Sequence, residues 1–273
     1  MFTRFSARAL VVGLLMATIF VAYVSATHSW GPYHWARTSN PFTLTVVDSV
    51  TSSWDAYLDG AITDWTAASV LDLTKVAGSI NSTQRWLCRP VSGRIRACNY
   101  PYGNTGWLGL AQIWITGGEH ITQGTTKLND TYFNTATYNT PAWRRLVTCQ
   151  EIAHDFGLAH QDEIFDNSNL GSCMDYTSNP LGPPSNEHPN ADDYNQIEII
   201  YSHLDGTSTV GTSKLPSSMP PAMGQINFDT PAQWGRRIWS SANGRVQWFE
   251  LDFGGGHKVI TRVVWADAAA DGR

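Results

Sequence analysis

Two stretches of the chain repeat apolar residues at the three- and four-residue intervals of an amphipathic helix. In the first, from about residue 51 to 68, Trp54, Leu58 and Trp65 share one face behind candidate Ser and Thr caps. The second, from about 141 to 156, opens on a proline, which is favoured in a first helical turn. Its apolar residues form two stripes, so we expect this helix to be largely buried.

Short runs rich in β-branched and aromatic residues predict strands around these helices. They cover residues 43–47, 106–116 and 121–129, the last two separated by a pair of glycines. A strand, a helix and then further strands indicate an α/β layer with helices packed on a sheet.

The C-terminal part of the chain has a different pattern. Residues 206–222 are rich in Gly, Ser, Thr and Pro and are typical of a linker. Residues 223–273 then form a small β-rich region with three predicted strands, at 237–240, 245–253 and 258–265. Three short strands are marginal alone, so we expect them to dock on the main domain or on a partner. Their tryptophans fit a carbohydrate- or surface-binding module, and core packing explains them equally well.

Composition narrows the class of protein. The chain has 273 residues, of which 42% are hydrophobic and only 15% charged, so it is neither a disordered chain nor a coiled coil. Its net charge of −5 offers no basic field for phosphate groups. We therefore expect no nucleic-acid partner.

The first 26 residues have the pattern of a secretory signal peptide. Two arginines precede an apolar stretch from Ala9 to Val24, and small residues precede a cleavage point at Thr27. The apolar stretch is shorter than the roughly 20 residues of a membrane-spanning helix. We therefore predict a secreted, extracellular protein that has no membrane association after signal cleavage.

Four cysteines in an exported chain indicate two disulfide bonds. Cys88 and Cys98 would close a short loop, which leaves Cys149 for Cys173. The sequence by itself allows three pairings.

A metal site is predicted around residue 150. Gln150 and His154 lie one helical turn apart, about 6 Å along the axis, with Glu151 beside them. His160 could not reach the same ion along a continuing helix. Gly157 removes this difficulty, because glycine readily adopts the left-handed conformation that ends a helix and turns the chain back.

With Met174 downstream, these residues resemble the metzincin zinc proteases, whose signature HExxHxxGxxH is followed by a Met-turn. The resemblance extends from about Tyr33 to Asp205 and is nearest to the secreted, matrixin-like group. It implies a catalytic domain at residues 27–205, built on a twisted mixed sheet. The sequence departs from the signature at its first position, where Gln150 replaces histidine.

The resemblance implies a role for each matching residue. His154 and His160, with Gln150 in the third position, would be ligands of Zn²⁺. Glu151 would be the general base that takes a proton from a zinc-bound water and later protonates the leaving amine.

Three further features carry implied roles. Met174 would form an apolar floor below the metal, and Tyr176 would stabilise the oxyanion of the reaction or ligate zinc. Residues 103–131 are similar to the region with the edge strand along which such enzymes hold an extended substrate.

Two functions remain open because an amide oxygen is a weaker zinc ligand than imidazole. The first is a zinc metalloendopeptidase that hydrolyses internal bonds of a polypeptide substrate, in which Gln150 is a poor ligand or another group replaces it. The second is a pseudoprotease that binds polypeptide in a retained cleft. The retained Glu151 favours the enzyme. His120 and His188 are candidate substitute ligands, although surface histidines are more common than ligands.

A loop after His160 is crowded with oxygen donors that could hold Ca²⁺. It lacks the glycine and distal glutamate of an EF-hand, so a hydrogen-bonded acidic loop is the better expectation. Its donors are Asp162, Glu163, Asp166, Asn167 and Asn169.

Matrixins are commonly kept latent by a propeptide cysteine, and no cysteine precedes Cys88 here. Any control would therefore come from a separate inhibitor, from the C-terminal strands or from low intrinsic activity.

Overall fold

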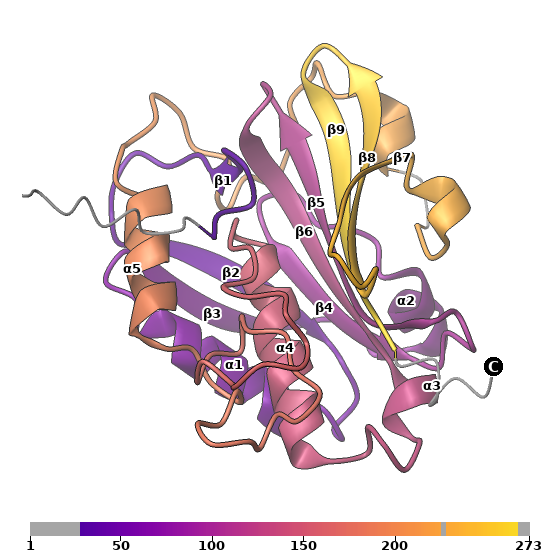
Figure 1. Cartoon of the computed structure of the whole chain (residues 1–273). Coiled ribbons are helices and arrows are strands. Elements are labelled where there is room, and N and C mark those ends of the chain that lie inside the picture. Colours follow the sequence, from indigo (N-terminus) through magenta and orange to yellow (C-terminus); the bar gives the residue numbers. More distant parts are fainter. Residues whose placement is uncertain (1–27, 225–227, 267–273) are drawn as a thin grey trace, which may run out of the picture.

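The fold is a twisted mixed β-sheet with its main helices on one face (Figure 1), seen in a computed structural model that describes residues 28–224 and 228–266. The α/β class is therefore confirmed. The predicted signal peptide, residues 1–26, lies outside the described residues. The sheet has nine strands within the described ranges, in the order β3-β2-β4-β6-β5-β9-β8-β7, with β1 paired to β6. The strands are β1 (His34–Trp35), β2 (Phe42–Ser49), β3 (Leu71–Ala77), β4 (Ile95–Tyr100), β5 (Trp107–Thr116), β6 (His120–Asn129), β7 (Arg236–Ser240), β8 (Val246–Gly254) and β9 (His257–Trp265).

Both predicted main helices are present. They are α1 (Asp55–Thr66) and α4 (Pro141–His154), and the described chain also contains α2 (Ser82–Leu87), α3 (Asp130–Phe133), α5 (Ala191–Ile200) and the 3₁₀ turns η1 (Pro221–Gly224) and η2 (Pro231–Gln233). Thr140 caps α4 by accepting a hydrogen bond from the backbone N–H of Trp143. The predicted Ser or Thr cap of α1 is wrong, because Trp54 occupies the N-cap position and makes no side-chain cap.

Helices α1 and α4 pack against one another and cover the same face of the sheet (Figure 1). The indole N–H of Trp65 in α1 donates to the backbone carbonyl of Cys149 in α4 at 3.0 Å. The α4 stripes are buried as expected, and every residue from Leu146 to His154 is inaccessible to solvent or nearly so. The helix therefore holds its polar residues, Gln150, Glu151 and His154, inside the molecule.

The three C-terminal strands continue the central sheet. Strand β9 pairs antiparallel with β5, and Ala111 is the register partner of Arg262. A second apolar cluster joins β5 to this region through Trp107, Leu110 and Trp114, which pack with Met223, Phe228, Trp234, Phe249, Val259 and Val263. The tail thus docks on the main sheet.

This pairing corrects the expectation that residues 103–131 supply a free edge for substrate. Strand β5 is hydrogen-bonded to β6 on one side and to β9 on the other. The position at which an extended substrate would add to the sheet is occupied by the chain's own strand.

The segment predicted as a linker follows the surface of the domain. The backbone N–H of Thr209 donates to the carbonyl of Ala36, and that of Gly211 to the carbonyl of Gly93. Met219 is buried in the second apolar cluster.

The predicted disulfides are both present. Cys88 bonds to Cys98, and Cys149 bonds to Cys173. The second bond ties α4 to the segment that carries Met174. No helix within residues 28–224 and 228–266 combines the length and apolar character needed to cross a membrane.

Candidate active site

The turn after α4 depends on a glycine. Gly157 has a φ of +99°, and a Cβ atom there would lie 2.3 Å from the backbone oxygen of Tyr33. Any other residue would therefore meet both backbone strain and a steric clash. The predicted bend is present, and it brings the rings of His154 and His160 to a centroid separation of 5.0 Å.

The protonation state of His154 is set by a backbone carbonyl. Its Nδ1 lies 2.7 Å from the oxygen of Leu158, which can only accept a hydrogen bond, so Nδ1 carries the proton. Nε2 then presents a lone pair, and it has no hydrogen-bond partner among the described residues. Burial, followed by the nearby charge of Arg262, holds the pKa of His154 well below its usual value. The ring is therefore a neutral donor suited to a metal.

His160 is also a buried, neutral imidazole. Its pKa is held well below the usual value, first by burial and then by the charges of Arg262 and other neighbours. Neither ring nitrogen has a hydrogen-bond partner in the described part of the chain. Its Nδ1 is 3.5 Å from the carboxylate of Glu163, and its ring stacks on Tyr176.

Glu151 is buried between α4 and β5. Burial raises its pKa to about 8, against a smaller opposing effect of Arg262. Both carboxyl oxygens lack a hydrogen-bond partner within the described ranges. A Cβ atom on Gly109 of β5 would lie 2.4 Å from Oε1 of Glu151, so the absence of a side chain there makes room for the carboxyl group.

Gln150 faces the Met-turn segment. Its Nε2 donates to the backbone carbonyl of Cys173 at 3.0 Å, which leaves Oε1 as the amide atom with ligand character. Met174 is fully buried, and its carbonyl accepts from the backbone N–H of Gln161, next to His160. Hydrogen bonds thus link the predicted Met-turn to Gln150 in α4 and to the residue that follows His160.

Tyr176 lies beside His160 but also contacts the C-terminal strands. Its hydroxyl is 3.3 Å from the carbonyl of Arg245 and 3.4 Å from that of Trp265. The hydroxyl group of Tyr176, to which the resemblance assigns stabilisation of the oxyanion, therefore contacts the C-terminal strands instead.

Arg262 is a site residue that the sequence patterns did not reveal. It extends from β9 toward the α4 face of the sheet and is fully buried. Its Nη2 donates to Glu163 at 2.9 Å, and its guanidinium lies over the ring of Trp248, while its Nε and Nη1 have no hydrogen-bond partner among the described residues. Burial lowers its pKa to about 10, so it stays charged at neutral pH. The sequence signal that could have revealed it is its position two residues from Ile260 and from Val264, which places a charged residue on the apolar face of a predicted strand.

The donor atoms fit zinc, but their surroundings oppose it. Two neutral imidazoles with unpaired nitrogens, an amide oxygen and a carboxyl group match the ligand types and the base of a catalytic zinc site. The charge of Arg262 acts on Glu151, His154 and His160 alike, and it would repel a divalent cation bound by them.

The candidate substitute ligands lie elsewhere. His188 is exposed and pairs with Asp64 at 2.8 Å, and His120 lies 3.3 Å from Asp205. In the acidic loop, Asp162 accepts from the backbone of Ile164 and from the side chain of Asn167, as expected of a hydrogen-bonded loop.

Comparisons with known proteins do not assign a family. No protein-family model and no curated protein matches the sequence. Among solved structures, the chain is similar to high choriolytic enzyme 1, a hatching enzyme zinc-protease from the medaka fish Oryzias latipes. The identity is 13% and the TM-score 0.36, and the alignment covers 62% of this chain and 94% of that one. A likeness at this level does not bear on function.

Proposed function

We propose that the chain is a secreted zinc metalloendopeptidase that hydrolyses internal peptide bonds of polypeptides. One observation carries the proposal: His154, His160 and Glu151 are buried together, and His154 Nε2, both His160 ring nitrogens and both Glu151 oxygens lack a hydrogen-bond partner among the described residues. Leaving so many buried polar atoms unpaired is costly unless they bind something.

Each side chain has a distinct task in this proposal. His154 and His160 hold the metal, with Gln150 Oε1 as the third protein ligand. Zinc, when bound, supplies a Lewis acid that lowers the pKa of a water nucleophile. Glu151 would accept the proton of the attacking water and pass it to the leaving amine.

Substrate access requires a change at the C-terminal strands. An extended polypeptide that pairs with β5 must replace β9, and the withdrawal of β9 also removes Arg262 from the histidines. The proposed enzyme is therefore latent in the arrangement described here, with the tail as its internal inhibitor.

A second candidate function, a pseudoprotease that binds polypeptide without cutting it, is favoured by Arg262. A buried guanidinium beside both histidines replaces the positive charge that a metal would bring. In that case a bound polypeptide would compete with β9 for the edge of β5.

Secretion is supported by the sequence pattern of residues 1–26 and by the two disulfide bonds. Expression of the full chain in a secreting host, followed by N-terminal sequencing of protein from the medium, tests this point. We expect a new N-terminus at Thr27, and retention of the whole chain inside the cell would contradict secretion.

The deciding experiment combines zinc analysis of the purified protein with a peptide-cleavage assay. We expect Glu151→Gln to lower cleavage by roughly a hundredfold or more while zinc is retained. Glu198→Gln, at an exposed position of α5, is the matched control. Gln150→His should increase zinc retention because imidazole is the better ligand. If the wild type, Gln150→His and Arg262→Met proteins all fold, hold no zinc beyond that of the His154→Ala and His160→Ala double variant, and cut no peptides, the pseudoprotease replaces the enzyme.

A further inference from the structure

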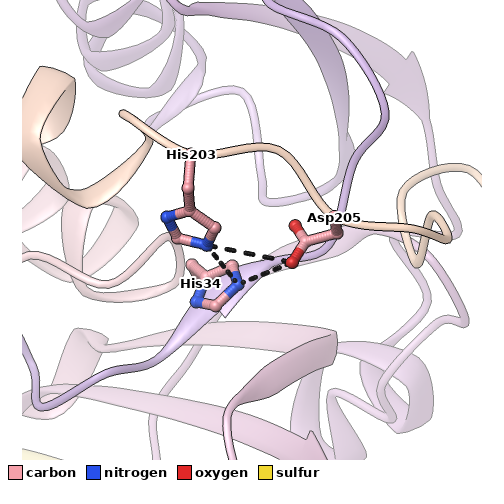
Figure 2. A group of neighbouring side chains, drawn as sticks. All are labelled: His34, His203 and Asp205. Atoms are coloured by element: carbon pink, nitrogen blue, oxygen red, sulfur yellow. Dashed lines mark hydrogen bonds and ion pairs between the residues drawn. The ribbon is translucent and has the colours of Figure 1, made fainter.

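A second group of histidines lies apart from the α4 site, where β1 meets the chain that follows α5. His34 is on β1 and His120 is its register partner at the start of β6, so the two side chains leave the sheet on the same side. His203 and Asp205 lie on the chain that follows α5, and their side chains lie beside that of His34 (Figure 2). Segments distant in sequence thus bring three imidazoles to one carboxylate.

The distances among His34, His203 and Asp205 are close to the edges of a coordination tetrahedron, whereas His120 contacts Asp205 without joining this group. Asp205 Oδ1 lies 3.4 Å from Nε2 of His34, 3.3 Å from Nε2 of His120 and 3.8 Å from Nε2 of His203. The Nε2 atoms of His34 and His203 are 3.2 Å apart. Four ligands at about 2.0 to 2.1 Å from a zinc ion would be separated by about 3.4 Å.

The surrounding contacts aim the donor atoms inward. His34 Nδ1 donates to the carbonyl of Pro32 at 2.7 Å, so its Nε2 presents a lone pair to the cluster. The other oxygen of Asp205, Oδ2, accepts from the backbone N–H and the guanidinium of Arg37. Such outer bonds orient the ligands of metal sites.

Without a cation, the cluster would place like groups against one another. The lone pair of His34 Nε2 faces the carboxylate oxygen of Asp205, and both are acceptors. A proton on His34 would relieve this one contact, whereas one divalent ion would satisfy His34, His203 and Asp205 together. A cavity of about 250 Å³ lined by His34, Glu119 and His203 gives an ion access from solvent.

We propose that His34, His203 and Asp205 form a three-ligand zinc site. Two imidazoles and a carboxylate are a donor set that suits zinc, and a solvent molecule would complete the coordination sphere. Such a site would tie β1 to the chain after α5. It uses none of the residues of the proposed peptidase site and stands or falls independently of that function.

The test is zinc analysis of a background protein, the full chain in which His154→Ala and His160→Ala remove the ligands of the candidate active site. We expect this background protein to keep about one zinc per chain. Adding His203→Ala should weaken zinc binding at least about tenfold, while adding His188→Ala should leave it unchanged. His188 is the matched control, because it is also an exposed histidine with a carboxylate neighbour.

Replacement of zinc by Co²⁺ gives a second measurement. We expect the visible absorption of tetrahedral Co²⁺ in the background protein and its loss in the His203→Ala protein. A background protein that binds neither metal, or equal zinc binding by the His203→Ala and His188→Ala proteins, would overturn the proposal. If the background protein does not fold, His203→Ala in the otherwise wild-type chain should remove one zinc that His188→Ala leaves in place.

Discussion

Arg262 carries a buried positive charge into the candidate active site. Within the described ranges it forms an ion pair with Glu163, and two of its nitrogens lack a hydrogen-bond partner. We predict that Arg262→Met raises zinc affinity about tenfold or more, because the repulsion of a divalent cation is removed. Stability should fall by up to about 3 to 5 kcal/mol, since the change removes one partner of a buried ion pair and leaves the carboxylate of Glu163 without its cation.

Zinc titration and urea unfolding of purified protein measure these two effects. Arg236→Met is the control, because that arginine is largely exposed and pairs with Glu250 at the surface. A folded Arg262→Met protein with the zinc affinity of the wild type would show that the guanidinium does not act on the metal site.

Lys127 on β6 gives a separate, pH-dependent prediction. It is buried and pairs with Asp229, near the C-terminal strands. Burial lowers its pKa below the usual 10.5, although Asp229 opposes the change. Between the folded and unfolded pKa values the unfolded chain binds more protons, so stability rises with pH in this window, with a slope of at most about 1.4 kcal/mol per pH unit.

Urea unfolding from pH 8 to 10 tests this sign. The wild type should become more stable along the series relative to Lys127→Met, which lacks the titrating group. Parallel pH profiles for the two proteins would contradict the assignment.

The residues of the candidate active site that are close in sequence could be predicted, because helical spacing and a glycine bend bring them together. Gln150, His154, Gly157 and His160 lie within a few turns of chain. Arg262 could not be found in this way, since it lies 99 residues from its partner Glu163 and is positioned by strand pairing.

At the level of elements, the disulfide between Cys149 and Cys173 joins α4 to the Met-turn segment. The bond closes a loop of 24 residues, and its loss should cost about 3 kcal/mol of stability by the chain-entropy model. We predict that Cys149→Ser with Cys173→Ser also lowers zinc retention, because Gln150 bonds to the carbonyl of Cys173.

The other disulfide is the matched control. Cys88→Ser with Cys98→Ser opens a loop of 10 residues and should cost slightly less, with zinc retention unchanged in the folded protein. Equal loss of zinc from the two double variants would mean that the Cys149–Cys173 bond has no special connection to the site. Thermal unfolding and zinc analysis on the same samples separate the two effects.

Runs of β-branched and aromatic residues predicted six of the strands but not β1, β3 or β4, and they did not predict which strands pair. The run from Lys258 to Trp265 predicts a strand, and β9 extends from His257 to Trp265. Nothing local to that run specifies β5 as its partner. The choice depends on the apolar face shared by Leu110, Trp114 and Val263, which only the assembled sheet brings together.

For the whole molecule, the position of the tail predicts what happens when residues 223–273 are deleted. The deletion exposes Trp107, Leu110 and Trp114 and leaves β5 with an unpaired edge. At about 1.5 to 3 kcal/mol for each large apolar side chain, the loss is comparable to the total stability of a typical domain, about 5 to 15 kcal/mol. We therefore expect the shortened chain to aggregate, measured as loss of soluble protein and of a monomer peak on gel filtration.

Supplying residues 223–273 as a separate chain is the control, and it should restore solubility by rebuilding the β5–β9 pair. A soluble, folded monomer of the shortened chain would mean that the main domain is complete without the tail. Such a monomer would also be the most direct material for the peptidase assay, because β5 would be open to substrate and Arg262 would be absent. The deletion therefore distinguishes two roles of residues 223–273: either the main domain requires them to fold, or they only cover β5.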